Sequence, residues 1–156
     1  ADALIGVGEG DGADSMIRLA ARAARPIHLA RFQPRNAAQF LGRNCLAFAA
    51  IGDPEKFFKT LEDAHVRLAR CQGFPDHHPF TEDEIKDLLA EAELYGLDLI
   101  TTGKDYVRLQ SGHGRAQELL EKTSVLEIDL RFDSPDVPDV IIQAALTAFG
   151  RRREAR

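Results

Sequence analysis

The stretch Phe74–Phe80, which runs Phe-Pro-Asp-His-His-Pro-Phe, contains the residues of this chain best suited to moving a proton. Asp76 directly precedes His77 and His78, and a proline lies on either side of the three. Proline fixes its own φ and drives the preceding residue toward extended backbone, which favours a rigid, non-helical turn. Histidine changes its charge closest to neutral pH, and an adjacent carboxylate can orient its ring. The pattern predicts an acid–base site; a solvated loop without a role is the alternative.

Cationic side chains follow two other predicted strands. Lys56 lies at the start of a helix that follows Gly52. Lys104 and Arg108 are four residues apart, so they share one face of a short helical turn. Cations and free N–H groups at a helix start can hold a phosphate, whereas salt bridges to neighbouring aspartates would give these residues a purely structural role.

A glycine-rich segment near the beginning of the chain resembles a nucleotide fingerprint only weakly. Residues 8–13 fit the degenerate pattern G-x-G-x-x-A between a strand and a helix. Glu9 and Asp11 would repel a pyrophosphate, and Arg31 stands where that motif needs an acid. The segment is interpreted as a turn.

Two further motifs are incomplete. Gly103-Lys104 does not close a phosphate loop, because Asp98 stands in place of glycine and Asp105 in place of serine or threonine. The chain has no other match to that loop. Asp76-His77-His78 also spells the signature triplet of the DHH phosphoesterases, but two metal ions would need further aspartates in ligand motifs. No metal ligands are assigned.

The bulk composition is that of one soluble globular domain. The 156 residues are 44% hydrophobic and 29% charged, with a net charge of −5 and a pI near 5.5, which argues against a nucleic-acid partner. Cys45 and Cys71 lack metal or redox spacing and are expected to be buried, reduced thiols. Neither an apolar run of about 18 residues nor a signal peptide is visible. Arginines in residues 15–43 and the tail 151–156 suit a solvated face or an anionic membrane surface.

Strands and helices alternate along the chain, which predicts parallel strands joined by helical crossovers. The fold class is therefore α/β: a layered sandwich with a mostly parallel sheet flanked by helices. Asp53 is expected to cap one helix, Thr81 and Glu84 to form a capping box, and Gly96 to end that second helix. Strands are predicted at 1–8, 27–32, 45–51, 65–72, 97–102 and 125–132, helices at 14–24, 54–64, 82–95 and 136–149, and short helical pieces at 36–41 and 104–109, with 116–122 unassigned.

The chemical residues follow three of these strands. Gly52, the His-His turn and Lys104 each come directly after a strand, and ligands in parallel sheets gather at the carboxyl ends of strands. We expect the three segments to cluster at one edge of the sheet.

Three ordered segments carry a family resemblance. They are 46–58 (LAFAAIGDPEKFF), 74–80 (FPDHHPF) and 101–109 (TTGKDYVRL), and the similarity is dense from about 43 to 109. In this order they resemble the C-terminal domain of the tetraacyldisaccharide 4'-kinases. Two positions depart from the family pattern: Ala50 replaces glycine, and Gly103 replaces glutamate, which removes a carboxylate beside the expected site.

The resemblance implies an ATP-dependent lipid kinase that transfers the γ-phosphoryl group to the 4'-hydroxyl of a lipid A disaccharide precursor. It implies ATP and Mg²⁺ for the complete enzyme, whose phosphate loop and magnesium-binding acids would lie in an N-terminal half, so this chain alone should be inactive. The complete enzyme would act peripherally at the cytoplasmic face of the inner membrane, while this chain is expected to be soluble.

The resemblance also assigns roles to residues and regions. His77 would pair with an aspartate of the other half to activate the hydroxyl, with Asp76 orienting it. The nucleotide or its phosphates would be contacted by His78, Lys104, Arg108, Gly52 and Lys56. Residues 1–42 would end the N-terminal catalytic core and form a linker strand, 43–150 would form the C-terminal α/β domain, and 151–156 a basic tail. The rival hypothesis is a non-catalytic α/β module that binds an anionic ligand or a partner through its strand-end loops.

Overall fold

The structure, a computed structural model, describes residues 2–8 and 14–154 and divides the chain into two compact units. Unit 1 comprises residues 1–33 and 129–156, and unit 2 comprises residues 34–128. The chain therefore passes from one unit to the other twice, and unit 2 is an insertion within unit 1. These bounds differ from the expected domain limits of 1–42, 43–150 and 151–156, which come from the family resemblance and stay a prediction. The glycine-rich turn expected at 8–13 lies, apart from Gly8, outside the described residues.

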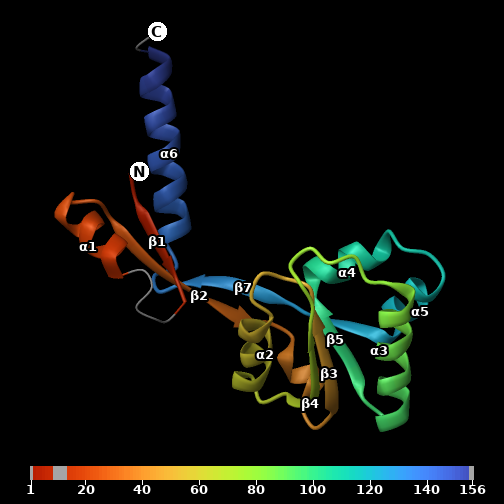
Figure 1. Cartoon of the computed structure of the whole chain (residues 1–156). Helices are drawn as coiled ribbons and strands as arrows, with labels where there is room; N and C mark the ends of the chain where they lie inside the picture. The colour runs from red at the N-terminus through yellow and green to blue at the C-terminus, as the bar shows by residue number, and fades with distance from the viewer. Residues whose placement is uncertain (1, 9–13, 155–156) are drawn as a thin grey trace. The chain divides into compact units, whose positions relative to one another are not determined.

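Unit 2 is a parallel α/β sandwich, which confirms the predicted fold class. Its sheet has the order β4-β3-β5-β6, and every neighbouring pair is parallel. Figure 1 shows α2 on one side of this sheet and α3 with α5 on the other. The elements are η2 (Ala37–Phe40), β3 (Asn44–Ala49), α2 (Pro54–Asp63), β4 (Arg67–Gly73), α3 (Glu82–Tyr95), β5 (Asp98–Thr102), α4 (Gly103–Gln110), α5 (Arg115–Lys122) and β6 (Thr123–Leu126).

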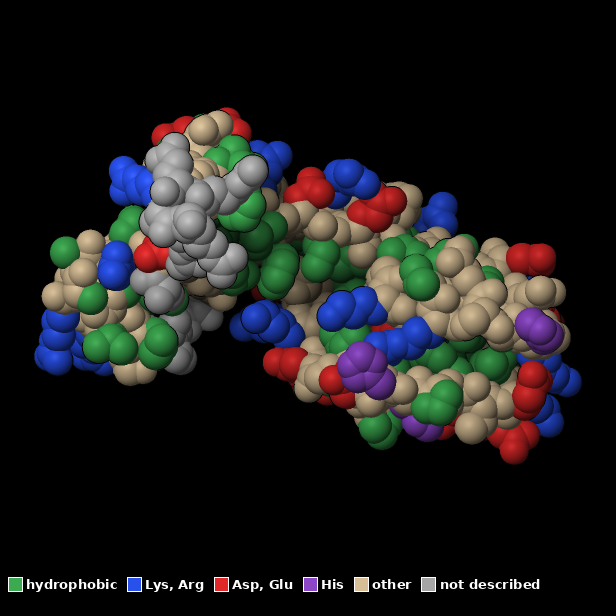
Figure 2. Space-filling model, turned by 90° about the horizontal axis from the view of Figure 1, so that it is seen from above, with side chains coloured by type: hydrophobic (Ala, Val, Ile, Leu, Met, Phe, Trp, Pro, Cys, Tyr) green, Lys and Arg blue, Asp and Glu red, His purple; other side chains and the backbone are tan. Residues whose placement is uncertain are grey.

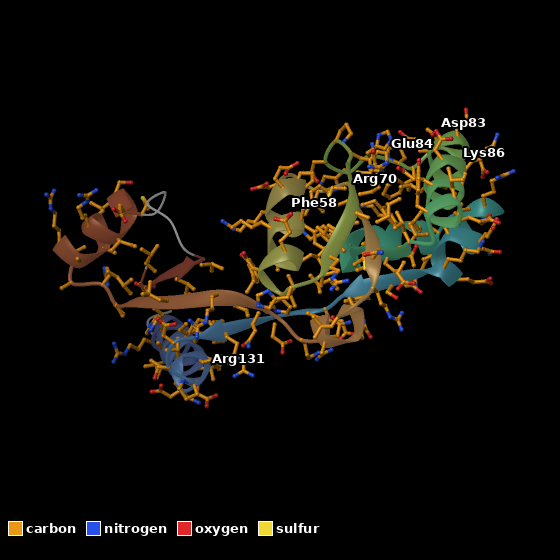
Figure 3. The ribbon with its side chains drawn as sticks, turned by 90° about the horizontal axis from the view of Figure 1, so that it is seen from below. Phe58, Arg70, Asp83, Glu84, Lys86 and Arg131 are labelled. Carbon is orange, nitrogen blue, oxygen red and sulfur yellow. The ribbon has the colours of Figure 1, made fainter. Side chains whose placement is uncertain are left out.

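The central strand β3 is buried on both faces, which explains its nearly continuous apolar sequence. Leu46 and Phe48 face a core cluster formed with α3, α4 and α5. Cys45, Ala47 and Ala49 face a second cluster formed with α2 and η2. Figure 3 labels Phe58 on α2 and Glu84 on α3, the helices that cover these opposite faces.

The helix ends of unit 2 follow the predicted capping residues. The Asp53 carboxylate accepts the backbone N–H of Lys56, and Pro54 occupies the first turn of α2. Thr81 and Glu84 form a reciprocal capping box at the start of α3. Gly96 ends α3 in the left-handed conformation, with φ 62°. The two N-terminal signals fix where the loops that follow β3 and β4 end.

Unit 1 has its own small sheet of order β1-β2-β7, in which β1 and β2 are parallel. Its elements are β1 (Leu4–Val7), α1 (Asp14–Arg22), β2 (Ile27–Pro34), β7 (Ile128–Phe132) and α6 (Val137–Glu154). No described helix is long and apolar enough to cross a membrane.

The prediction of one strand over residues 125–132 was wrong. The segment forms β6 of unit 2 and β7, which belongs to the sheet of unit 1. The Asn36 side chain accepts the Glu127 N–H at 2.9 Å and donates to the Val125 carbonyl, also at 2.9 Å, while the Arg35 N–H donates to the Glu127 carbonyl at 2.8 Å. These bonds engage the backbone around Glu127, so Glu127 belongs to neither strand and β6 ends before β7 begins.

The two cysteines differ in their surroundings. Cys45 is fully buried in β3, as expected, and burial raises the pKa of its thiol to about 11. Cys71 was expected to be buried as well, but it is exposed, because β4 lies at the edge of its sheet. Both are free thiols.

Candidate active site

The three chemical segments meet at the carboxyl edge of the unit 2 sheet because β4, β3 and β5 are parallel neighbours. The segment after β3 contacts the His-His turn directly: the His77 N–H donates to the Ala50 carbonyl at 3.2 Å. A Cβ atom added to Gly52 would lie 3.5 Å from the Asp76 carboxylate, so the carboxylate packs closely against this glycine. The expected parallel arrangement of these strands is thus confirmed.

His77 presents its ring to solvent from an unusual backbone. Its φ is 60°, in the left-handed region that non-glycine residues rarely adopt, and its side chain is 78% exposed. The Arg108 guanidinium Nη2 lies 2.9 Å from Nδ1 of the ring, and the nearest Asp76 oxygen lies 3.7 Å from Nε2. Arg108 therefore makes the direct hydrogen bond to the ring, and Asp76 acts at longer range.

A buried carboxylate anchors Arg108. Asp105 is 0% exposed and accepts hydrogen bonds from the Ala50 N–H at 3.0 Å, the Thr102 hydroxyl at 2.7 Å and Arg108 Nη1 at 2.8 Å. Arg108 Nη1 also donates to the Ala50 carbonyl at 2.7 Å. The Asp105–Arg108 pair thus holds both polar backbone groups of Ala50 and connects α4, β3 and the His-His turn.

His78 is bound into the protein rather than projecting from it. Its Nε2 lies 2.9 Å from both carboxylate oxygens of Glu84, and its ring stacks on Phe74 and meets Phe80 edge-on. The Thr81 N–H, and next the His78 ring, hold the pKa of the Glu84 carboxyl below its ordinary value. His78 therefore fastens the turn to the first turn of α3.

The remaining predicted phosphate contacts lie on the surface. Lys104 is exposed in the first turn of α4, and Lys56 is exposed in the first turn of α2. The Asp53 carboxylate already occupies the N–H of Lys56, so an anion at the start of α2 would have to replace it. The Thr102 hydroxyl occupies the start of α4 in the same way by accepting the Asp105 N–H, so each lysine offers its side chain rather than a free helix start.

A cavity of about 400 Å³ opens beside the His77 ring. Apolar side chains of α3, α4 and α5 line one part of it, and Arg108 with the two histidines lines another. Figure 2, which views the carboxyl edge, shows a histidine beside basic side chains with apolar side chains nearby. The lining residues are His77, His78, Pro79, Phe80, Ile85, Arg108, Leu109, Ser111, Gly112 and Ala116.

Reasoning from the sequence missed two parts of this site. The sequence indicates Asp105 as a departure from the phosphate-loop pattern and as a salt-bridge partner, although its position three residues after Thr102, at the helix start that follows a strand, also signals a cap contact. The cavity combines residues from separate helices and carries no local signal. Among the residues that the structure describes, no three His, Cys, Asp or Glu side chains lie close enough together to hold a metal ion.

The fold and the site define a class: a parallel α/β domain whose strand-end loops carry histidine and cationic side chains. Comparison with known proteins is more specific, because residues 1–146 match the tetraacyldisaccharide-1-P 4'-kinase family. The chain belongs to this family.

Relatives share this similarity at high identity over nearly the whole chain. A tetraacyldisaccharide 4'-kinase of Rhizobium meliloti is 48% identical over 98% of this chain, and those of Agrobacterium fabrum and Brucella anthropi are 46% and 44% identical over 92% and 97%. The chain spans only 44%, 41% and 44% of the lengths of these three relatives. No solved structure matches the chain.

Proposed function

We propose that this chain is the C-terminal part of a tetraacyldisaccharide 4'-kinase and supplies His77 to its active site. The complete enzyme transfers the γ-phosphoryl group of ATP to the 4'-hydroxyl of a lipid A disaccharide precursor. Family membership together with the exposed His77 ring at the carboxyl edge carries this proposal. The relatives are named tetraacyldisaccharide 4'-kinases, and the chain covers less than half of their length.

His77 is proposed to activate the hydroxyl in partnership with an aspartate from the remainder of the enzyme. Phosphoryl transfer depends mainly on positioning and on stabilisation of charge, with one group to receive or relay the hydroxyl proton. Asp76 lies 3.7 Å from Nε2 of His77, a distance at which it orients the ring electrostatically. The other family roles divide by contact: Lys104 is exposed and can approach phosphate, while His78 bonds to Glu84 and Gly52 packs against Asp76, so both support the turn.

ATP is a substrate of this reaction, and the donors at the carboxyl edge suit its phosphates. Lys104 is an exposed cation in the first turn of α4, and phosphate groups bind such side chains, whereas Arg108 is already bonded to Asp105 and to the Ala50 carbonyl. Mg²⁺ fits this chain less well, because the described residues contain no cluster of carboxylates that could hold it. We assign the ion to the remainder of the enzyme and derive no step through it.

The lipid substrate and the membrane belong to the same proposal. A lipid A disaccharide precursor lies in a bilayer, so the complete enzyme is proposed to work peripherally at the cytoplasmic face of the inner membrane. The exposed arginines of α1, Arg18 and Arg22, suit contact with anionic lipid. The proposal includes no nucleic-acid partner.

The decisive experiment uses the complete protein that contains this chain. The protein is incubated with γ-labelled ATP, Mg²⁺ and a tetraacyldisaccharide 1-phosphate in mixed micelles, and the phosphorylated lipid is separated and its new phosphate located. Phosphate on the 4'-hydroxyl is expected. A complete protein that folds and binds lipid or nucleotide but transfers no phosphate would instead support a non-catalytic α/β module.

A further inference from the structure

We propose that Arg108 is a positioning residue that fixes which nitrogen of the His77 ring carries the proton. Buried Asp105 holds Arg108 in place for this task. The catalytic consequence of this inference rests on the proposed kinase function, whereas the protonation pattern of the ring is a property of this chain alone.

The position of the guanidinium is set by groups that have little freedom to move. Asp105 is fully buried and accepts three hydrogen bonds, and the Ala50 carbonyl belongs to the backbone directly after the central strand. Arg108 Nη1 donates to both acceptors, at 2.8 and 2.7 Å. Because a guanidinium is planar, these two bonds also fix the direction of Nη2.

Nη2 then decides the protonation pattern of the imidazole. It lies 2.9 Å from Nδ1 of His77. An arginine nitrogen can only donate a hydrogen bond, so Nδ1 must accept with its lone pair, and the proton of the neutral ring must be on Nε2. The nearest charged group to Nε2 is the Asp76 carboxylate, at 3.7 Å, which favours the same arrangement.

The backbone contributes to the same alignment. The His77 N–H and Arg108 Nη1 donate to the same Ala50 carbonyl, at 3.2 and 2.7 Å. The Ala50 carbonyl oxygen therefore holds the main chain of His77 directly and holds its ring through Arg108. The left-handed backbone of His77 is kept in place by this shared acceptor.

The chemical consequence concerns what His77 offers to its surroundings. While Nδ1 is bound to Arg108, the ring presents Nε2–H as a hydrogen-bond donor. Such a ring can orient a carboxylate and share the charge that develops on it.

The first test measures the ring directly in this chain. Long-range ¹H–¹⁵N spectra distinguish a nitrogen that carries a proton from one that accepts a hydrogen bond, and the His77→Gln spectrum assigns the signals. The neutral ring is expected to be protonated on Nε2 alone in the unmodified chain and to become a mixture of both forms in Arg108→Met.

Two further variants keep this test decisive. Arg43→Met removes a similar Arg–Asp pair with Asp98, 3.3 Å long and at the start of β5, and is expected to leave the His77 signals unchanged. Arg108→Lys retains a cation beside Asp105 and is measured in case the methionine variant unfolds. An unchanged His77 ring in a folded Arg108 variant would overturn the proposal.

The second test uses the kinetics of the complete enzyme. Partners that orient a metal-bound histidine typically contribute about 10- to 100-fold, and we take the same range for a partner that orients a catalytic histidine. Arg108→Lys is expected to lower kcat by about that factor while the KM for ATP stays nearly constant. In a His77→Ala background the same substitution should cause no further loss, because its target is gone.

The two tests separate the two proposals. A raised KM for ATP, or losses that multiply in the double variant, would assign Arg108 to phosphate binding and overturn the positioning role. If the complete protein has no kinase activity, the proposed function fails, and the ring spectra still decide whether Arg108 sets the protonation of His77.

Discussion

His77 combines features that a merely solvated loop residue does not need. It adopts left-handed backbone, its N–H is bonded, and its ring is held by an arginine whose own anchor is fully buried. Non-glycine residues in that region carry a cost that the surrounding bonds must offset. Several hydrogen bonds and a strained backbone thus hold one exposed ring in place. This is the strongest reason at the residue scale to assign His77 a function.

Replacing this ring should affect turnover more than nucleotide affinity. In the complete enzyme, His77→Ala is expected to lower kcat by about 10²- to 10⁴-fold, the usual effect of removing a group that assists proton transfer. ATP affinity, measured by calorimetry, should change little. His113→Ala removes an exposed histidine that does not line the cavity and serves as the control. An unchanged kcat in His77→Ala would return the residue to the solvated-loop interpretation.

Glu84 gives the site a pH-dependent support. Bonds from the Thr81 N–H and from His78 hold its carboxyl pKa below the ordinary value of about 4.3, so the folded state favours the ionised form. Its contribution to stability is fully present above that ordinary value and is lost as the pH falls through the lowered pKa.

We therefore expect Glu84→Gln to destabilise the chain near neutral pH and to matter less in acid. Urea unfolding of both proteins at about pH 7 and about pH 3.5 measures this, and the difference in unfolding free energy should shrink at the lower pH. Glu82→Gln, which changes a neighbouring glutamate outside the capping box, is the matched control. A difference that grows in acid would contradict the assigned role.

At the scale of elements, α2 and α3 could be predicted because their end signals are local, whereas α5, which has no side-chain cap, could not be assigned from the sequence. Asp53, the Thr81–Glu84 box and Gly96 each act within a few residues of the helix they bound, and all three appear as expected. The division between β6 and β7 could not be predicted in this way. It depends on Asn36 and Arg35, which are about ninety residues away in sequence.

The candidate site likewise has a part that could be predicted from the sequence and a part that could not. The edge on which Gly52 and His77 lie follows from the alternation of strands and helices, because parallel strands bring their carboxyl ends together. The hydrogen bonds of Asp105 and the cavity beside His77 depend on side-chain packing between separate elements. The spacing of Thr102 and Asp105 signals their cap contact alone, and no spacing in the sequence encodes the bond from Ala50 to Asp105 or the cavity.

The sandwich itself should depend on Leu61, a fully buried residue of α2. Leu61→Ala is expected to lower the unfolding free energy by about 2–5 kcal/mol, because it removes apolar contacts and leaves a cavity. Leu94→Ala makes the same change on α3 at a side chain that is 73% exposed and should cost far less. Chemical denaturation of both variants provides the comparison, and equal losses would contradict the assignment of Leu61 to the core.

At the scale of the whole molecule, the chain has a folded sheet and a candidate catalytic ring but no phosphate loop. The isolated chain is therefore expected to fold and to transfer no phosphate. Far-ultraviolet circular dichroism tests the first part, and incubation with labelled ATP and a tetraacyldisaccharide 1-phosphate tests the second. ATP-dependent phosphorylation of that lipid by this chain alone would contradict the prediction.

Because unit 2 is inserted within unit 1, the two units become complete at different times while the chain is synthesised. Unit 2 is complete once residue 128 has emerged, and the Arg35–Glu127 pair then ties its two ends together. Strand β2 is made early, but β7, which pairs with it, is made only after the entire insertion. During that interval β2 has an open edge of the kind that pairs wrongly with other chains. A nascent chain stalled when residue 128 has just emerged from the ribosome should therefore hold a finished unit 2 and an unfinished unit 1, a state in which chaperone binding is most useful.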